Sequence, residues 1–325
     1  MATTGKKRLV TQSNMDGLAC GILLKEVDLI DSVLFAHPKD IESGRIEIGS
    51  NDITAGLPYK DGAHLAFDHY PSALAAKGGR ANLVVDSKMP STSRVICNYY
   101  KQADNPRISK DMLDSVDKGF SADISIDEIL SPTGWILFSY LIDQRTGLER
   151  FKSFGITSAQ LIERLMDQGK DQTIWEILNS PDVEERIDLY FSSMERCKAQ
   201  LLRCSTVHYN LVVTDMRMEE VVYPGNRFMI YALFPECNVS MHVINDANSD
   251  RTSFVVGKSI IDRSCEKNVG KILKEHGGGG HFNAGTCMVD KDSADELKGT
   301  LISELKYSTF ENIFNGYFNY YTGYY

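Results

Sequence analysis

The sequence contains no run of apolar residues long enough to cross a membrane or to form the core of a secretory signal. Its basic first residues, MATTGKKRLV, lead directly into a short strand-like segment. The seven cysteines are scattered and include no C-x-x-C pair of the kind that zinc sites use. These absences predict reduced thiols, no membrane partner and a cytoplasmic location.

The sequence also lacks an excess of basic residues. It has 35 Lys and Arg against 44 Asp and Glu, a net charge of −9. Because long polyanions bind to clustered positive charge, this balance excludes coating of long nucleic acids but leaves room for a local basic cleft. With 325 residues, 42% of them hydrophobic, the chain is long enough for two domains.

The first half of the chain alternates short strand-like runs with helical patterns over residues 8–150. This alternation predicts an α/β fold with a doubly wound, mostly parallel sheet. Such sheets bind ligands beyond the carboxyl ends of their strands. Asp16, Asp52 and Asp68 each follow a strand-like run, so we expect all three at that edge.

The second half divides into a helical part and a smaller α/β domain. Residues 126–200 read as helices, and a long helix starting at Ser180-Pro181 predicts a connector over about 181–204. We therefore expect a first domain over 1–190 and a second over 205–308. The aromatic tail, 309–325, is expected to dock on the body, or to mediate self-association into a homo-oligomer.

Three segments in order along the chain carry a family resemblance: TQSNMDG, FDHYPSA and GGGGHFNAG. Together they resemble the DHH/DHHA1 phosphoesterases, a group that includes exopolyphosphatase-related proteins, single-strand exonucleases and cyclic-dinucleotide phosphodiesterases. The resemblance covers residues 8–305. It implies a DHH domain followed by a smaller DHHA1 domain.

The resemblance assigns site residues in the first domain by four motifs. The matches, in motif order, are Gln12, Asn14 and Asp16 for His-x-Asp-x-Asp, Asp52 for a single Asp, Asp68, His69 and Tyr70 for Asp-His-His, and Asp117 for a last Asp near a helix end. The catalytic residues so implied are Asp16, Asp52, Asp68 and His69. Tyr70 replaces a substrate-contacting histidine, and a phenol carries no positive charge at neutral pH.

The resemblance also implies two divalent ions, usually manganese. One site is reduced to the amides Gln12 and Asn14 with Asp52, and hard dications prefer anionic oxygen, so we expect that site weak or empty. The other keeps Asp16, Asp52, His69 and Asp117, a set that suits one Mn²⁺ or Mg²⁺ ion.

In the second domain the resemblance places the substrate phosphate on Gly278, Gly279, Gly280 and His281, with Arg263 upstream. Glycines let backbone N–H groups approach an anion closely, and an arginine adds bidentate hydrogen bonds.

Two functions follow as alternatives. The first is metal-dependent hydrolysis of a phosphate-bearing small molecule or short oligonucleotide, attenuated by the substitutions at Gln12, Asn14 and Tyr70. The second is a catalytically silent module that binds or senses a nucleotide, because a binder needs only the anion site. Arg94 is expected on a solvated face.

Overall fold

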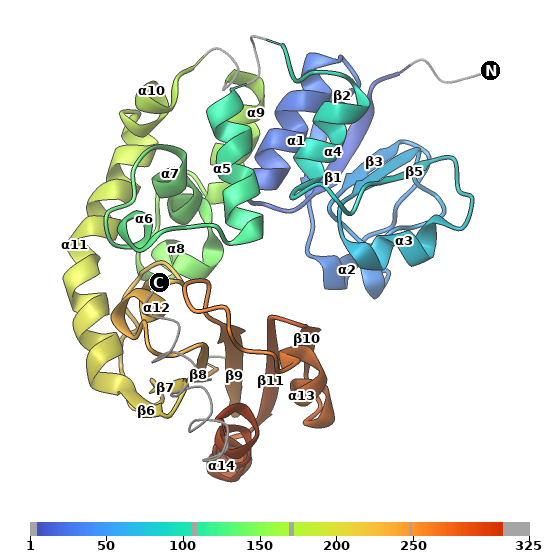
Figure 1. Cartoon of the computed structure of the whole chain (residues 1–325). Coiled ribbons are helices and arrows are strands. Elements are labelled where there is room, and N and C mark those ends of the chain that lie inside the picture. The colour runs from blue at the N-terminus through green and yellow to red at the C-terminus, as the bar shows by residue number, and fades with distance from the viewer. Residues whose placement is uncertain (1–4, 106–108, 169–171, 247–248, 308–325) are drawn as a thin grey trace, which may run out of the picture. The chain divides into compact units, whose positions relative to one another are not determined.

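The computed structural model describes residues 5–105, 109–168, 172–246 and 249–307 (Figure 1). The predicted aromatic tail lies outside these residues. The chain forms two compact units. The first unit comprises residues 1–124 and 131–192, and the second comprises residues 125–130 and 193–325.

The first unit is built on a five-stranded parallel sheet with the order β2-β1-β3-β4-β5. The strands are β1 (Lys7–Thr11), β2 (Ile30–Phe35), β3 (Asp52–Ala55), β4 (Leu65–Asp68) and β5 (Leu83–Val85). This strand order reverses direction between β1 and β3, and ligands of doubly wound sheets bind at the carboxyl ends of the strands beside such a reversal.

Helices cover both faces of this sheet, because successive side chains of a strand point to opposite faces. Val10 on β1 packs with Ile41 of α2 (Pro38–Glu42), and Ala66 on β4 packs with Ala73 of α3 (Pro71–Lys77). Figure 1 shows α1 (Met15–Glu26) and α4 (Thr92–Tyr99) on the opposite side of the sheet from α2 and α3. The predicted doubly wound α/β fold is confirmed.

The rest of the first unit is helical. Its helices are α5 (Lys110–Ser121), α7 (Gly134–Ile142), the 3₁₀ turn η1 (Gln144–Thr146), α8 (Leu148–Phe151), α9 (Ser158–Gln168), α10 (Ile174–Leu178) and the start of α11 (Pro181–Cys204). α1 packs against α4, α5 and α9. The long helix begins at Pro181 as predicted, because proline suits the first turn, where the backbone N–H has no helical partner.

The second unit contains a six-stranded mixed sheet with the order β10-β11-β9-β8-β7-β6. Its strands are β6 (Ser205–His208), β7 (Leu211–Asp215), β8 (Val239–Asn245), β9 (Arg251–Lys258), β10 (Gly279–His281) and β11 (Ala284–Asp290). The unit also holds α6 (Ile126–Leu130), α12 (Met229–Leu233), α13 (Val269–Glu275), the 3₁₀ turn η3 (Lys291–Ser293) and α14 (Ala294–Leu305).

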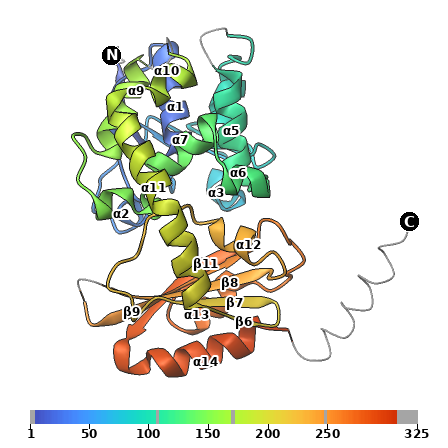
Figure 2. The same ribbon diagram turned by 90° about the vertical axis from the view of Figure 1, so that its left-hand side faces the viewer.

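Helices lie on both faces of the second sheet as well. Met241 of β8 shares a core with Leu273 of α13 and Leu301 of α14. Its neighbour Ser240 points the other way and bonds to Tyr231 of α12 through its hydroxyl, at 2.9 Å. Figure 2 accordingly shows α12 and α14 on opposite sides of the strands.

Among the helices of the described residues, none combines the length and the hydropathy that a membrane crossing requires.

Candidate active site

Asp16 is buried at the carboxyl edge of the first sheet and is held by the start of α4. Its Oδ1 accepts a hydrogen bond from the backbone N–H of Ser93 at 2.8 Å, and its Oδ2 accepts one from Thr92 at 3.2 Å. Only 5% of Asp16 is exposed. Because the N-terminus of a helix carries partial positive charge and free N–H groups, α4 stabilises the buried carboxylate with backbone donors.

The two amides of the first motif have structural roles. Asn14 caps α1, because its Oδ1 accepts the N–H of Gly17 at 2.9 Å. Gln12 donates its Nε2 to the carbonyl of Gly56 at 2.9 Å, which links β1 to the end of β3. Both side chains therefore stabilise the loop between β1 and α1.

The Asp-His-Tyr segment begins with the last residue of β4 and joins this cluster. His69 Nδ1 lies 2.9 Å from the hydroxyl of Thr92, the residue whose N–H binds Asp16. Burial lowers the pKa of His69, although Asp16 and Asp117 oppose that shift by their negative charge. The Tyr70 ring lies 4.2 Å from the His69 ring, and burial raises the pKa of its phenol to about 12. The Tyr70 hydroxyl therefore stays protonated at neutral pH.

Asp68, the last residue of β4, ends the strand with a buried carboxyl group. Its Oδ1 accepts the N–H groups of His69 at 2.7 Å and of Tyr70 at 2.9 Å. Burial raises the pKa of Asp68 to about 6, although these two hydrogen bonds lower it. The carboxylate form of Asp68 is thus destabilised in the folded protein.

Asp117 on α5 is bound by two side chains at the start of α4. Ser91 donates to Oδ1 at 2.6 Å, and Arg94 donates its Nε to Oδ2 at 2.8 Å. Arg94 also donates to Asp114 at 2.9 Å. The expectation of a solvated Arg94 is wrong, since its side chain is 21% exposed and pairs with both carboxylates.

Asp52 does not lie at this edge of the sheet, contrary to the expectation from its position in the sequence. It is the first residue of β3 and pairs in register with Arg8 near the start of β1, so it lies at the amino edge. Arg8 binds both carboxylate oxygens, at 2.8 and 3.1 Å. At the carboxyl edge β3 is followed by Gly56, whose added Cβ would lie 3.9 Å from Asp16 Oδ2. No carboxylate therefore extends from this position toward Asp16.

These contacts do not fit the divalent ions that the family resemblance implies. Among the described residues, no three His, Cys, Asp or Glu side chains are arranged to hold a metal ion. Asp16 and Asp117 accept hydrogen bonds on both oxygens from groups of the protein, and Asp52 lies at the other edge. The charge of the two clustered carboxylates is balanced by Arg94 and by the start of α4.

A signal for the start of α4 is present in the sequence. Ser91-Thr92-Ser93 precedes a helical pattern, and Ser91 caps α4 by accepting the N–H of Arg94 at 3.2 Å. Such a run marks a helix N-terminus, and a helix N-terminus can hold an anion. The partner of that N-terminus, Asp16, lies more than seventy residues upstream.

The glycine segment of the second unit forms an edge strand and a tight packing contact. β10 lies at the end of the sheet, and an edge strand leaves backbone groups unpaired on its outer side. Gly278 donates its N–H to Leu273 at 2.9 Å, so this N–H serves the end of α13. An added Cβ on Gly270 of α13 would lie 2.6 Å from the Gly280 carbonyl carbon. These glycines therefore also allow α13 to pack closely on β10.

His281, the last residue of β10, is exposed and its ring is oriented by a neighbour. Its Nδ1 accepts the backbone N–H of Asn283 at 3.3 Å, which leaves Nε2 as the protonated nitrogen of the neutral ring. Arg263 is exposed on the loop that joins β9 to α13, and its Nε donates to the carbonyl of Ile260 at 3.2 Å. Both side chains offer donors that suit a phosphate.

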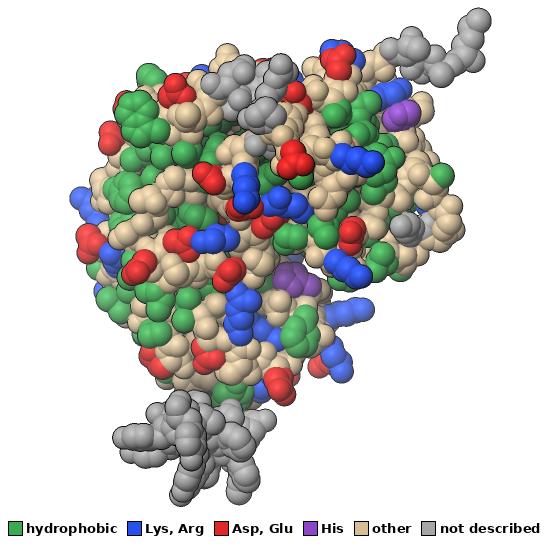
Figure 3. Space-filling view, turned by 45° about the horizontal axis from the view of Figure 1, so that its top comes forward, with side chains coloured by type: hydrophobic (Ala, Val, Ile, Leu, Met, Phe, Trp, Pro, Cys, Tyr) green, Lys and Arg blue, Asp and Glu red, His purple; other side chains and the backbone are tan. Residues whose placement is uncertain are grey.

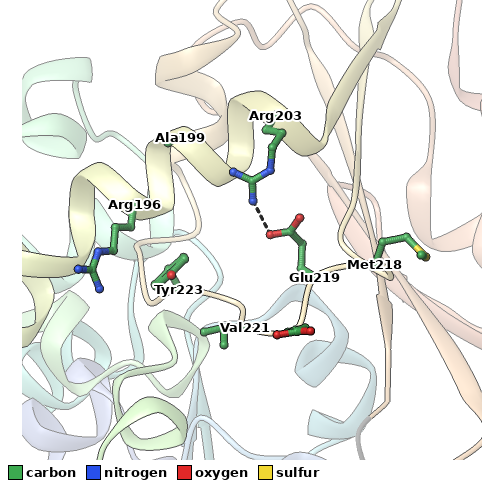
Figure 4. Close-up of a pocket in the computed structure, with 8 residues that line it drawn as sticks. Arg196, Ala199, Arg203, Met218, Glu219, Val221 and Tyr223 are labelled. Atoms are coloured by element: carbon green, nitrogen blue, oxygen red, sulfur yellow. Dashed lines mark hydrogen bonds and ion pairs between the residues drawn. The ribbon is translucent and has the colours of Figure 1, made fainter.

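A pocket of about 460 Å³ in the second unit is lined by residues of α11 and of the segment that follows β7, and not by these glycines (Figure 4). Arg203 reaches its wall but is paired with Glu219 at 2.5 Å, and Arg196 lies 5.9 Å from the Tyr223 ring centroid. Glu220 adds a further negative charge to the lining. Because positive and negative side chains balance, this pocket does not select an anion. Acidic and basic side chains are likewise interspersed over the face that Figure 3 shows.

The two units together combine a doubly wound sheet carrying Asp-His at the end of its fourth strand with a second sheet edged by Gly-Gly-His. The structure is similar to that of a pGpG-specific phosphodiesterase, PggH, from Vibrio cholerae, with a TM-score of 0.80 and 41% sequence identity over 92% of this chain and 99% of that one. The chain belongs to the DHH family of phosphoesterases.

A more distant structure shares the fold. An exonuclease RecJ bound to manganese matches with a TM-score of 0.53 and 13% identity, over 93% of this chain and 90% of that one. An exopolyphosphatase-related protein from Bacteroides fragilis matches with a TM-score of 0.49 and 12% identity, over 92% of each chain. No family model and no curated protein matches the sequence.

Proposed function

We propose that the protein is a phosphodiesterase that acts on short linear dinucleotides of the pGpG kind. The observation that carries this proposal is the 41% identity to a pGpG-specific phosphodiesterase over nearly the full length of both chains. A small phosphorylated ligand also agrees with the net charge of −9, which disfavours long polyanions.

The second unit supplies the phosphate-binding groups in this proposal. His281 Nε2 donates a hydrogen bond to a terminal phosphate oxygen, and Arg263 adds a fork of charged donors. Gly278 does not take part through its N–H, which is already donated to Leu273.

The first unit supplies the polar centre at which we place the reaction. Asp16, Asp68 and His69 lie at the carboxyl edge of the sheet, and His69 and Asp16 share Thr92 as a hydrogen-bond partner. In related two-metal hydrolases bound ions generate the nucleophile and neutralise phosphate charge. The residues of this protein do not fit such ions. We therefore assign to Asp16, Asp68 and His69 the role of holding and orienting the polar groups of this centre.

A second candidate function is binding of the same dinucleotide without hydrolysis. The hydrogen bonds that occupy Asp16 and Asp117 favour it, because these carboxylates already have protein donors in place of metal ions. A protein of this kind would retain the groups around His281 and would sequester or sense the nucleotide.

The test is to incubate the full-length protein with pGpG and to measure binding by calorimetry and GMP release by chromatography. Cyclic dinucleotides, polyphosphate and long single-stranded DNA are the comparison substrates. Binding with GMP release supports the phosphodiesterase, and binding without release, with and without added Mn²⁺, supports the second candidate.

His281→Ala should weaken binding of pGpG. His208→Ala, which alters a histidine on β6 at the opposite edge of the same sheet, is the matched control. No binding of pGpG would refute both functions.

A further inference from the structure

Phe282 is an exposed aromatic side chain directly after His281. It lies in the two-residue turn between β10 and β11, and 50% of it is exposed. A single half-exposed ring is common on a protein surface, and Phe282 differs from the others by its place directly after His281, beside the groups proposed to bind phosphate.

The turn that carries Phe282 is fixed on both sides. The carbonyl of Phe282 accepts the N–H of Val269, the first residue of α13, at 3.2 Å. The carbonyl of Asn283 accepts the N–H of Lys258, the last residue of β9, at 2.9 Å. The ring therefore projects from a rigid hairpin, which lowers the entropy lost when a ligand packs on it.

A lysine holds one face of the ring. Lys258 Nζ lies 3.5 Å from the centroid of the Phe282 ring and donates to the carbonyl of Cys265 at 2.9 Å. Cys265 belongs to the loop that also carries Arg263. The ammonium thus fixes the ring by a cation–π contact and adds positive charge near the proposed phosphate site.

We propose that Phe282 is the platform on which a nucleobase of the ligand stacks, with Lys258 holding the ring from its other face. This inference rests on the proposed function and names the residue that distinguishes a nucleotide from a simple phosphate. Stacking of a base on an aromatic ring raises affinity about 5- to 150-fold per base. His281 and Arg263 bind the phosphate, and Phe282 binds the base.

The experiment measures the affinity of the full-length protein for pGpG and for inorganic pyrophosphate, a probe without a base, by calorimetry. Phe282→Leu keeps apolar bulk but removes the ring, and it should weaken pGpG binding about 5- to 150-fold while leaving pyrophosphate binding unchanged. Phe282→Trp should retain pGpG affinity, and the fluorescence of the new indole should be quenched by bound guanine.

Tyr209→Leu is the matched control. Tyr209 is also about half exposed, and Lys306 Nζ lies 5.8 Å from its ring centroid, but it lies between β6 and β7, at the other edge of the sheet. Its replacement should leave both affinities unchanged.

The outcomes separate this inference from the proposed function. If Phe282→Leu binds pGpG as tightly as the wild type, or weakens pyrophosphate equally, Phe282 is not a base platform and the proposed function stands. If the wild type binds pyrophosphate but has no added affinity for pGpG, the dinucleotide itself is the wrong ligand, and both fail.

Discussion

Replacing Asp68 by Asn should stabilise the protein at neutral pH. Burial raises the pKa of Asp68 from its ordinary value of 3.8 to about 6, so the folded protein disfavours the carboxylate that forms above that pH. One pH unit of difference corresponds to about 1.4 kcal/mol, and the charged side chain therefore costs the folded state about 3 kcal/mol at pH 7.5. An asparagine has no charge to bury, and its Oδ1 can still accept the N–H groups of His69 and Tyr70.

The sign of the pH dependence is fixed by this shift. The neutral acid is the favoured form in the folded state, so its contribution to stability is fully present below pH 3.8 and is lost as the pH rises through about 6. The gain from Asp68→Asn should be less than about 1 kcal/mol at pH 4 and about 3 kcal/mol at pH 7.5.

Urea unfolding of both proteins at the two pH values measures this difference. Asp61→Asn is the control, because Asp61 is exposed and paired with Arg80, and its replacement should change stability by less than about 1 kcal/mol. A gain equal at pH 4 and pH 7.5, or a loss at pH 7.5, would show that the burial of Asp68 is not the dominant cause of its properties.

Four further expectations concern packing, charge, metal and assembly. Gly17→Ala should destabilise the protein by more than about 2 kcal/mol in urea unfolding, because the new Cβ would overlap the carbonyl oxygen of Gln12. Arg8→Met should lower the free energy of unfolding by about 2 kcal/mol, because it leaves the buried Asp52 without its cation. Adding Asp52→Asn should restore part of this loss, and equal losses in the single and double variants would contradict the pairing. Mn²⁺ should bind weakly and leave the melting temperature unchanged, and a tight calorimetric site would contradict the assignment of the carboxylates to protein donors. If the tail mediates self-association, deleting residues 309–325 should reduce the number of chains per particle, measured from the molecular mass in solution. An unchanged number of chains with an intact fold would contradict that role.

The sequence predicts the fold well where strands and helices alternate with clear periods. The first sheet and the start of α11 at Pro181 follow from those patterns. The position of Asp52 does not, because the run that reads as a strand, residues 45–50, is not one, and the strand that follows has only four residues. A segment that short carries too little alternation to define where it begins.

The candidate site is predicted only in part for a different reason. Asn14, Asp16 and His69 are near the expected loops, but what each side chain does depends on partners that are distant in sequence. The N–H groups that bind Asp16 belong to residues 92 and 93. Motif spacing indicates which types of residue form a site. The hydrogen-bond partners that determine the role of each side chain are set by tertiary packing.

Residues 125–130 belong to the second unit although the chain on both sides of them belongs to the first. The carbonyl of Ile129 in this segment accepts a hydrogen bond from Asn226 at 3.0 Å. A fragment that starts at residue 193 would therefore lack one helix of its own unit and would leave a buried asparagine without that partner. Because the chain passes between the units at three points, no single proteolytic cut yields two complete halves. Neither unit can therefore be expressed whole as one continuous segment of the chain. Gene fusions or truncations of this protein must keep both units together.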